Sequence, residues 1–166
     1  IGYFDESLVH NQDFELNQRI IQNGRKLLLV PEIQSYYYNR DSLIKLFKQY
    51  FNYGFWKERV VAKNLQSFKL RYQIPLIFIL AIIFLGVGGF VNNDLWAYLR
   101  YFIMLYFISS IINSFYLGFN NSIKYIPVLP IIFIILHLSF AFGFFSSFLN
   151  QLFFLRSNSF FLHNIL

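Results

Sequence analysis

The chain of 166 residues carries 14 Lys and Arg against 8 Asp and Glu, a net charge of +6, and contains no Cys. Its charges are unevenly distributed. Residues 1–73 hold 11 basic and 7 acidic side chains, whereas the rest of the chain holds only Asp94, Arg100, Lys124 and Arg156. A stretch so poor in charge excludes an ordinary soluble domain for residues 74–166, which we expect to lie in lipid as a transmembrane helical domain. The lack of Cys does not distinguish a cytosolic from a membrane protein.

Several common kinds of site have no counterpart in the sequence. It holds no Gly-rich phosphate loop after a strand, no paired His with metal-ligand spacing and no Ser-His-Asp set. The GVGG segment at residues 86–89 ends an apolar run, so we interpret it as a flexible or closely packed helix end. The chain does not begin with Met and opens within what looks like a motif. We therefore expect it to be the C-terminal part of a longer protein.

The first predicted element is a helix over residues 12–22. Asn11 has a side chain suited to an N-cap, and Asn23-Gly24 is a strong stop signal. Leu16 and Ile20 are four residues apart and form an apolar stripe. The helix is therefore expected to pack one face against the rest of the protein.

The acidic side chains of this helix carry the first motif, QDFELNQR at residues 12–19, which follows IGYFDE at the start of the chain. The arrangement resembles the Gly-Gly-Phe-Asp-Glu and Glu-Asp-x-Glu-Leu-x-x-Arg segments near the end of the catalytic domain of family 2 glycosyltransferases. The resemblance implies that Asp13 is the catalytic base. It implies substrate binding by four further residues, Gly2, Gln12, Glu15 and Arg19. For Glu15 and Arg19, an ordinary ion pair on an amphipathic helix explains the pattern equally well.

Two short extended segments are predicted next, KLLLV at residues 26–30 and IQSYYY at residues 33–38. A helix followed by strands fits the tail of an α/β nucleotide-sugar domain. We therefore assign residues 1–40 to the end of a catalytic domain with the GT-A fold, as an α/β remnant. Tyr36, Tyr37 and Tyr38 either stack on a sugar or fill a half-buried sheet, and the sheet is favoured.

Residues 41–73 are expected to form an amphipathic helix region at the membrane interface. An Asp-Ser pair opens the segment, aromatic side chains recur at helical spacing, and basic residues accumulate before the first apolar run. Residues 49–57 read QYFNYGFWK, which resembles the Gln-x-Phe-x-Tyr-Gly-x-Trp-Lys form of the Gln-x-x-Arg-Trp region in membrane-bound exopolysaccharide transferases. The resemblance implies substrate binding by Gln49, Tyr53 and Trp56. Asn52 stands where the strict motif has Arg, which argues against a processive, cellulose-synthase-like activity.

Three apolar spans follow, at residues 74–91, 95–119 and 126–149. The first is about 27 Å long at 1.5 Å per residue, close to the thickness of a hydrocarbon core. The basic residues before the first span place that part of the chain in the cytoplasm. With about three transmembrane helices, the C-terminus is expected outside. His137 lies in the third span, where a hydrogen bond to a neighbouring helix is favoured over a role in ion or proton chemistry.

The resemblance implies an inverting membrane glycosyltransferase that moves a sugar from a nucleotide diphosphate donor to a glycan or lipid-linked acceptor, in polysaccharide biosynthesis. A Mg²⁺ or Mn²⁺ ion is expected on the donor, bound by residues upstream of this chain, and membrane lipids are expected as partners. No nucleic-acid partner is expected. The alternative hypothesis is a non-catalytic integral membrane protein, such as a channel, transporter or assembly subunit. That alternative does not explain why the two motifs occur in the first 57 residues.

Overall fold

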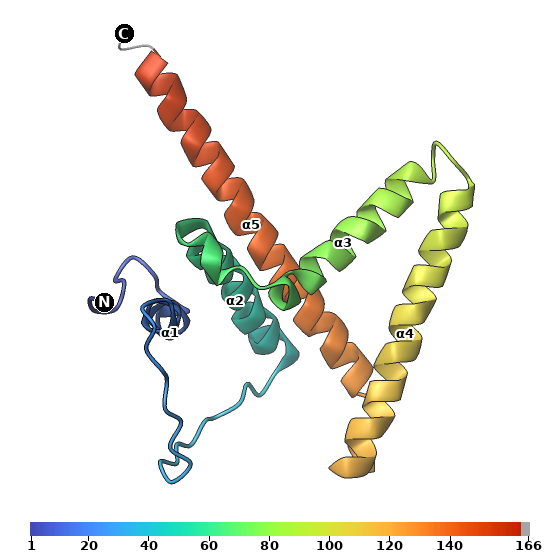
Figure 1. Ribbon diagram of the computed structural model, residues 1–166. Coiled ribbons are helices and arrows are strands. Elements are labelled where there is room, and N and C mark those ends of the chain that lie inside the picture. The colour runs from blue at the N-terminus through green and yellow to red at the C-terminus, as the bar shows by residue number, and fades with distance from the viewer. Residues whose placement is uncertain (164–166) are drawn as a thin grey trace.

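A computed structural model describes residues 1–163, and over this range the chain is helical (Figure 1). The long helix α5 runs diagonally through the molecule, with α2 lying along it. On one side of α5, α3 and α4 form a V, and α1 lies on the other side, beyond α2. The elements in chain order are α1 (Gln12–Gln22), α2 (Leu43–Lys63), η1 (Leu65–Ser67), α3 (Leu70–Gly88), α4 (Asp94–Asn120), η2 (Ile123–Tyr125) and α5 (Leu129–His163).

The expected α/β remnant is wrong, because the described residues contain no strand. The segment between α1 and α2 is irregular and exposed, with Leu28 87% and Tyr36 92% accessible. A β-strand is stable only beside another strand that satisfies its backbone N–H and C=O groups. The described part of the chain offers these β-prone segments no such neighbour.

The prediction of α1 is confirmed, with the helix at Gln12–Gln22. Gly24 follows it with a φ of 73°, a left-handed conformation that glycine adopts without strain, and the backbone N–H of Arg25 closes the helix end on the carbonyl of Ile20. Asn11 is the boundary residue, but its side chain does not cap the helix. Instead, its Nδ2 donates to the carbonyl of Tyr53, 3.2 Å away. The Asn11 side chain therefore links α1 to α2 instead of capping α1.

Helix α2 is continuous. It packs against α5 more extensively than any other two described helices pack against each other. Ser42 begins it as the Asp-Ser pair predicted, accepting a hydrogen bond from the Lys45 backbone N–H at 3.3 Å. Gly54 does not break the helix. A Cβ at Gly54 would overlap the carbonyl oxygen of Phe140, and a Cβ at Gly143 would overlap that of Phe51. The two glycines therefore let the backbones of α2 and α5 touch where they cross.

The number of predicted spans also needs correction. Two described helices are long and apolar enough to cross a membrane, α4 over Asp94–Asn120 and α5 over Leu129–Phe153, whereas the apolar part of α3, Tyr72–Gly88, is shorter. Only 17% and 22% of the two apolar windows are buried inside the protein. A core helix of a soluble protein would be mostly covered, so this exposure indicates surfaces that meet lipid. Helices α4 and α5 therefore have the length, composition and exposure of membrane spans.

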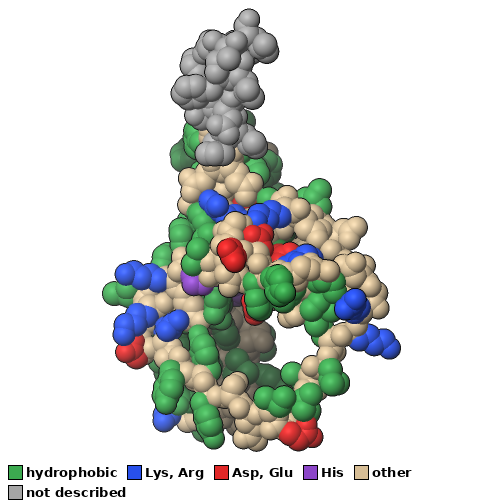
Figure 2. Space-filling view, turned by 90° about the vertical axis from the view of Figure 1, so that its left-hand side faces the viewer, with side chains coloured by type: hydrophobic (Ala, Val, Ile, Leu, Met, Phe, Trp, Pro, Cys, Tyr) green, Lys and Arg blue, Asp and Glu red, His purple; other side chains and the backbone are tan. Residues whose placement is uncertain are grey.

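Charged residues are concentrated in the other half of the molecule. Figure 2, which faces the side of the N-terminal segment, shows basic and acidic side chains distributed over this face with hydrophobic side chains between them. Lys63, at the end of α2, binds the N-terminal segment, because its Nζ contacts the Asp5 carboxylate at 2.5 Å. This contact, with a hydrogen bond from Ser7, lowers the pKa of Asp5 to about 2. The N-terminal segment is therefore fastened to the end of α2.

Candidate active site

An open cavity of about 630 Å³ lies between the start of α1 and α2. Its lining comes from the N-terminal segment, the first turn of α1, one face of α2, the start of α3 and the middle of α5. The polar residues on its lining include His10, Gln12, Asp13, Tyr50, Tyr53 and Lys57. The two sequence motifs, separated along the chain by the whole irregular segment, thus meet at one cavity.

Asp13 lies at the mouth of α1 because the preceding turn is fixed from two directions. Leu8, which is 1% exposed, anchors the segment in the interior, and the side chain of Gln12 donates to the carbonyl of Leu8. Asn11 adopts a left-handed φ of 63° and ties the turn to α2. The Asp13 carboxylate is exposed and lines the cavity. It is accessible to a substrate and lies in the first turn of α1.

Lys57 forms part of the opposite wall and is 8% exposed. Its Nζ lies 3.1 Å from the ring centroid of Phe14 and 4.7 Å from that of Tyr72. A cation over aromatic faces gains about 0.5–2 kcal/mol, which offsets part of the cost of burying the ammonium group. The lining of this cavity therefore combines one carboxylate with one cation.

Tyrosine hydroxyls complete the wall that α2 contributes. Tyr53 lines the cavity, and its hydroxyl accepts a hydrogen bond from Gln49 Nε2 at 2.7 Å, which leaves the Tyr53 proton free to be donated elsewhere. Burial raises the pKa of Tyr50, so its hydroxyl stays protonated. Gln49 also donates to the hydroxyl of Tyr37 at 2.8 Å, and it is not among the residues that line this cavity.

Trp56 supports the cavity from outside its lining. Its ring meets that of His10 edge to face, with centroids 6.4 Å apart, and His10 lines the cavity. The guanidinium of Arg59 lies 5.3 Å from the Trp56 ring centroid. Of the three residues predicted from the second motif, the structure thus places Tyr53 on the lining of the cavity, and Gln49 and Trp56 outside the lining.

Gly2, Glu15 and Arg19 lie together in a clamp that holds the start of the chain on α1. Arg19 pairs with Glu15 at 2.6 Å, and the hydrogen bond that Arg19 donates to the Glu15 carboxylate raises the pKa of Arg19. The same guanidinium donates to the carbonyls of Ile1 and Tyr3. Gly2 has a φ of 83°, and a Cβ there would lie 3.3 Å from an Arg19 nitrogen. The geometry favours a structural role for these three residues over substrate contact.

Lys57, His10 and Phe140 are cavity residues that the sequence interpretation did not select. A signal existed for Lys57, because Tyr50, Tyr53 and Lys57 recur at intervals of three and four residues and therefore share one face of α2. Phe140 comes from α5, and nothing in its local sequence indicates that it faces α2.

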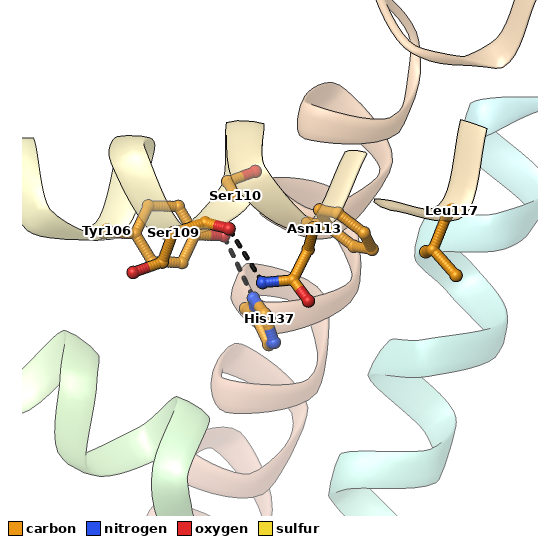
Figure 3. Close-up of a pocket in the computed structure, with 7 residues that line it drawn as sticks. Tyr106, Ser109, Ser110, Asn113, Leu117 and His137 are labelled. Atoms are coloured by element: carbon orange, nitrogen blue, oxygen red, sulfur yellow. Dashed lines mark hydrogen bonds between the residues drawn. The ribbon is translucent and has the colours of Figure 1, made fainter. Parts of the chain in front are cut away.

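A second, smaller cavity of about 300 Å³ lies between α4 and α5 (Figure 3). The Tyr106 hydroxyl and His137 Nδ1 are 3.0 Å apart across it. The preferred role of His137, a hydrogen bond to a neighbouring helix, is therefore confirmed. Asn113 turns back on its own helix and donates to the carbonyl of Ser109 at 2.7 Å. This cavity is lined by hydrogen-bonding groups without a carboxylate, so we assign it to helix packing.

The described residues form no group of three or more His, Cys, Asp or Glu side chains that could hold a metal ion. Asp13 is the one carboxylate on the lining of the larger cavity. A divalent ion on a nucleotide diphosphate normally takes one or two carboxylates and phosphate oxygens. The Mg²⁺ or Mn²⁺ ion expected from the resemblance, bound by residues upstream of this chain, stays a prediction.

Two curated proteins are similar to this chain. A "dolichyl N-acetyl-alpha-D-glucosaminyl phosphate 3-beta-D-2,3-diacetamido-2,3-dideoxy-beta-D-glucuronosyltransferase" of Methanococcus voltae is 28% identical over 142 residues, which are 86% of this chain and 40% of that protein. The succinoglycan biosynthesis protein ExoA of Rhizobium meliloti is 36% identical over 76 residues, 46% of this chain and 23% of that protein. No family model and no solved structure matches.

The chain spans less than half the length of either relative. One relative is by name a glycosyltransferase, and the other takes part in making a polysaccharide. The resemblance to glycosyltransferases that the two motifs indicated is therefore confirmed at partial coverage. This chain is similar to proteins of glycan and polysaccharide biosynthesis, over 86% of its length for the first relative and 46% for the second.

Proposed function

We propose that the chain is part of an inverting membrane glycosyltransferase of family 2, which transfers a sugar from a nucleotide diphosphate donor to a glycan or lipid-linked acceptor. The observation that carries the proposal is the meeting of the two motifs at one cavity, with Asp13 on one wall and Tyr53 on the other. The curated relatives support it, since both take part in building glycans or polysaccharides by name. They give no support to a channel or transporter subunit.

In the proposed mechanism, Asp13 acts as the general base. Its carboxylate accepts the proton of an acceptor hydroxyl while that oxygen attacks the anomeric carbon of the donor sugar. The bond to the nucleotide diphosphate breaks on the opposite face, and the diphosphate leaves with the bonding electron pair. A positioned base of this kind contributes about 10² to 10⁴ in rate. Gln12 lines the same cavity and can hold a sugar hydroxyl there.

We further propose that the basic part of the chain before α3 lies at the cytoplasmic face, because Lys and Arg near membrane spans favour that side. The expected outward C-terminus depended on three crossings. Two crossings, by α4 and α5, return the C-terminus to the cytoplasm. The contact between α2 and α5 also favours this arrangement, because Ser147 and Gln151, toward the end of the apolar part of α5, hydrogen-bond Glu58 of the basic helix α2.

The test of the base role is Asp13→Asn in the complete protein reconstituted in lipid. We expect transfer from a panel of nucleotide sugars to polyprenyl-phosphate acceptors to fall by at least about 100-fold, while binding of the nucleotide diphosphate is retained. Asp41→Asn is the matched control, since Asp41 is exposed and pairs with Lys45 on the surface. Near-normal turnover in Asp13→Asn would remove Asp13 from the base role.

A further inference from the structure

Lys57 is a cation placed where an ordinary surface lysine would not be. It is only 8% exposed, and yet it lines the cavity of about 630 Å³ between α1 and α2. Most lysines extend the ammonium group into water because desolvating it is costly. Lys57 instead keeps its Nζ against the rings of Phe14 and Tyr72. The two rings come from α1 and α3, so three helices combine to hold this charge at the cavity.

The groups around Lys57 are suited to an anion with several oxygen atoms. Tyr53 has a hydroxyl proton to donate, because its oxygen already accepts from Gln49. Tyr50 lines the same cavity from α2. The one acidic group of the lining, Asp13, belongs to α1, on the wall opposite α2. The lining from α2 therefore supplies two tyrosines and a positive charge, whereas the acidic group comes from α1.

We infer that Lys57, with the hydroxyls of Tyr50 and Tyr53, forms a phosphate-binding site within this cavity. The ligand is a phosphate or diphosphate ester, because its oxygens accept hydrogen bonds from both hydroxyls and its charge complements the ammonium group. A cavity of about 630 Å³ has room for the ester and for the attached sugar or lipid end. The inference rests on the proposed function only for the carrier of the phosphate, which is either the nucleotide donor or a lipid-linked acceptor.

Binding constants test the site without requiring turnover. The complete protein, in nanodiscs of zwitterionic phosphatidylcholine, is titrated by calorimetry with UDP, GDP and a short-chain polyprenyl monophosphate. In Lys57→Met we expect the affinity for at least one of these probes to fall by about 10- to 100-fold, as for loss of a charge-assisted contact. Lys57→Arg, which keeps the charge, should retain most of the affinity. Lys45→Met removes an exposed lysine of the same helix, 61% accessible, and should change nothing.

The pattern of losses identifies the carrier. Weaker binding of a nucleoside diphosphate alone assigns the site to the donor, and weaker binding of the polyprenyl phosphate alone assigns it to the acceptor. Unchanged affinity for all three probes, or an equal loss in Lys45→Met, would overturn the inference. Failure of Asp13→Asn to lower turnover would count against the proposed base and leave these binding results intact.

A measurement on the unmodified protein covers the case in which Lys57→Met does not fold. Acetylation of individual lysines by an amine-reactive ester is followed by mass spectrometry with and without each probe. A saturating phosphate ligand should slow modification of Lys57 at least about fivefold and leave Lys45 unaffected, because the ligand occupies one cavity only. Equal rates at Lys57 with and without every probe would show that no phosphate binds there.

Discussion

Glu58 is a buried carboxylate that joins α2 to α5, and its removal gives a sharp test of how these helices are held together. The residue is 5% exposed, and its Oε2 accepts hydrogen bonds from Ser147 Oγ at 2.7 Å and from Gln151 Nε2 at 2.9 Å. Ser147 is fully buried. Burial raises the pKa of Glu58, although the hydrogen bond from Ser147 and the charge of Arg59 oppose the shift.

The expected loss follows from what each substitution leaves behind. Glu58→Ala removes both hydrogen bonds and leaves the buried Ser147 hydroxyl without its acceptor. Hydrogen bonds to charged groups contribute about 1.5–3 kcal/mol each, and the partly accessible Gln151 amide can recover water. We therefore expect the free energy of unfolding to fall by about 2–4 kcal/mol. Glu58→Gln keeps one acceptor oxygen and removes the buried charge, so its effect should stay within about 1 kcal/mol.

The pH dependence supplies a second signature of the same group. A carboxyl whose pKa is higher in the folded than in the unfolded protein binds more protons when folded. Its contribution therefore lowers stability as pH rises from the unfolded value, near 4.5, through the folded value. Glu58→Gln has no such group. Over this pH window, the free energy of unfolding should therefore fall with rising pH in the unmodified protein and should change less in Glu58→Gln.

Thermal unfolding in detergent, followed by tryptophan fluorescence at a series of pH values, measures both effects. Glu32→Gln is a suitable control, because Glu32 is exposed in the irregular segment between α1 and α2. The reasoning is refuted if Glu58→Ala unfolds at the same temperature as the unmodified protein. Parallel pH curves for the unmodified protein and Glu58→Gln would refute the assignment of a raised pKa.

Two further predictions concern helix packing and topology. Gly54→Ala should lower the free energy of unfolding by about 1–3 kcal/mol, because its methyl group would overlap the backbone of α5. Gly86→Ala, where the nearest atom is 3.9 Å away, should be neutral or slightly stabilising in the same assay, and equal effects at the two sites would contradict the crossing. A phosphatase reporter that works only outside the cytoplasm should be silent after Leu166 and active near Ser122. The reverse pattern would indicate three crossings.

The helices could be predicted where the signal is local. The end of α1 depends on Gly24, which is visible in the sequence, whereas the start lacks the side-chain cap expected from Asn11. The strands could not be predicted in this way. KLLLV has the composition of a buried strand, but a strand requires a neighbour, and a composition of apolar residues does not say whether one is present. The exposure of Leu28 and Leu29 is the structural result of that missing neighbour among the described residues.

The candidate site was predictable in part. The motif containing Asp13 and the motif containing Tyr53 were found separately, and the structure brings them to one cavity. Gly2, Glu15 and Arg19 belong to the same motif as Asp13, yet they hold the chain start in place on another side of α1. A motif records which residue types occur together, and it does not distinguish side chains that meet a substrate from those that position them.

Helix α5 shows why mean hydropathy does not determine what surrounds a helix. Its Leu129–Phe153 segment has a mean hydropathy of 2.1 and passes as a membrane span. Nevertheless, Gly143, Ser147 and Gln151 face α2, and two of them hydrogen-bond a carboxylate. Averaging over the segment hides these residues among many Phe, Leu and Ile side chains. The polar side of α5 becomes visible only through its partner, because Glu58 supplies the acceptor and Gly54 the space that allow the two helices to meet.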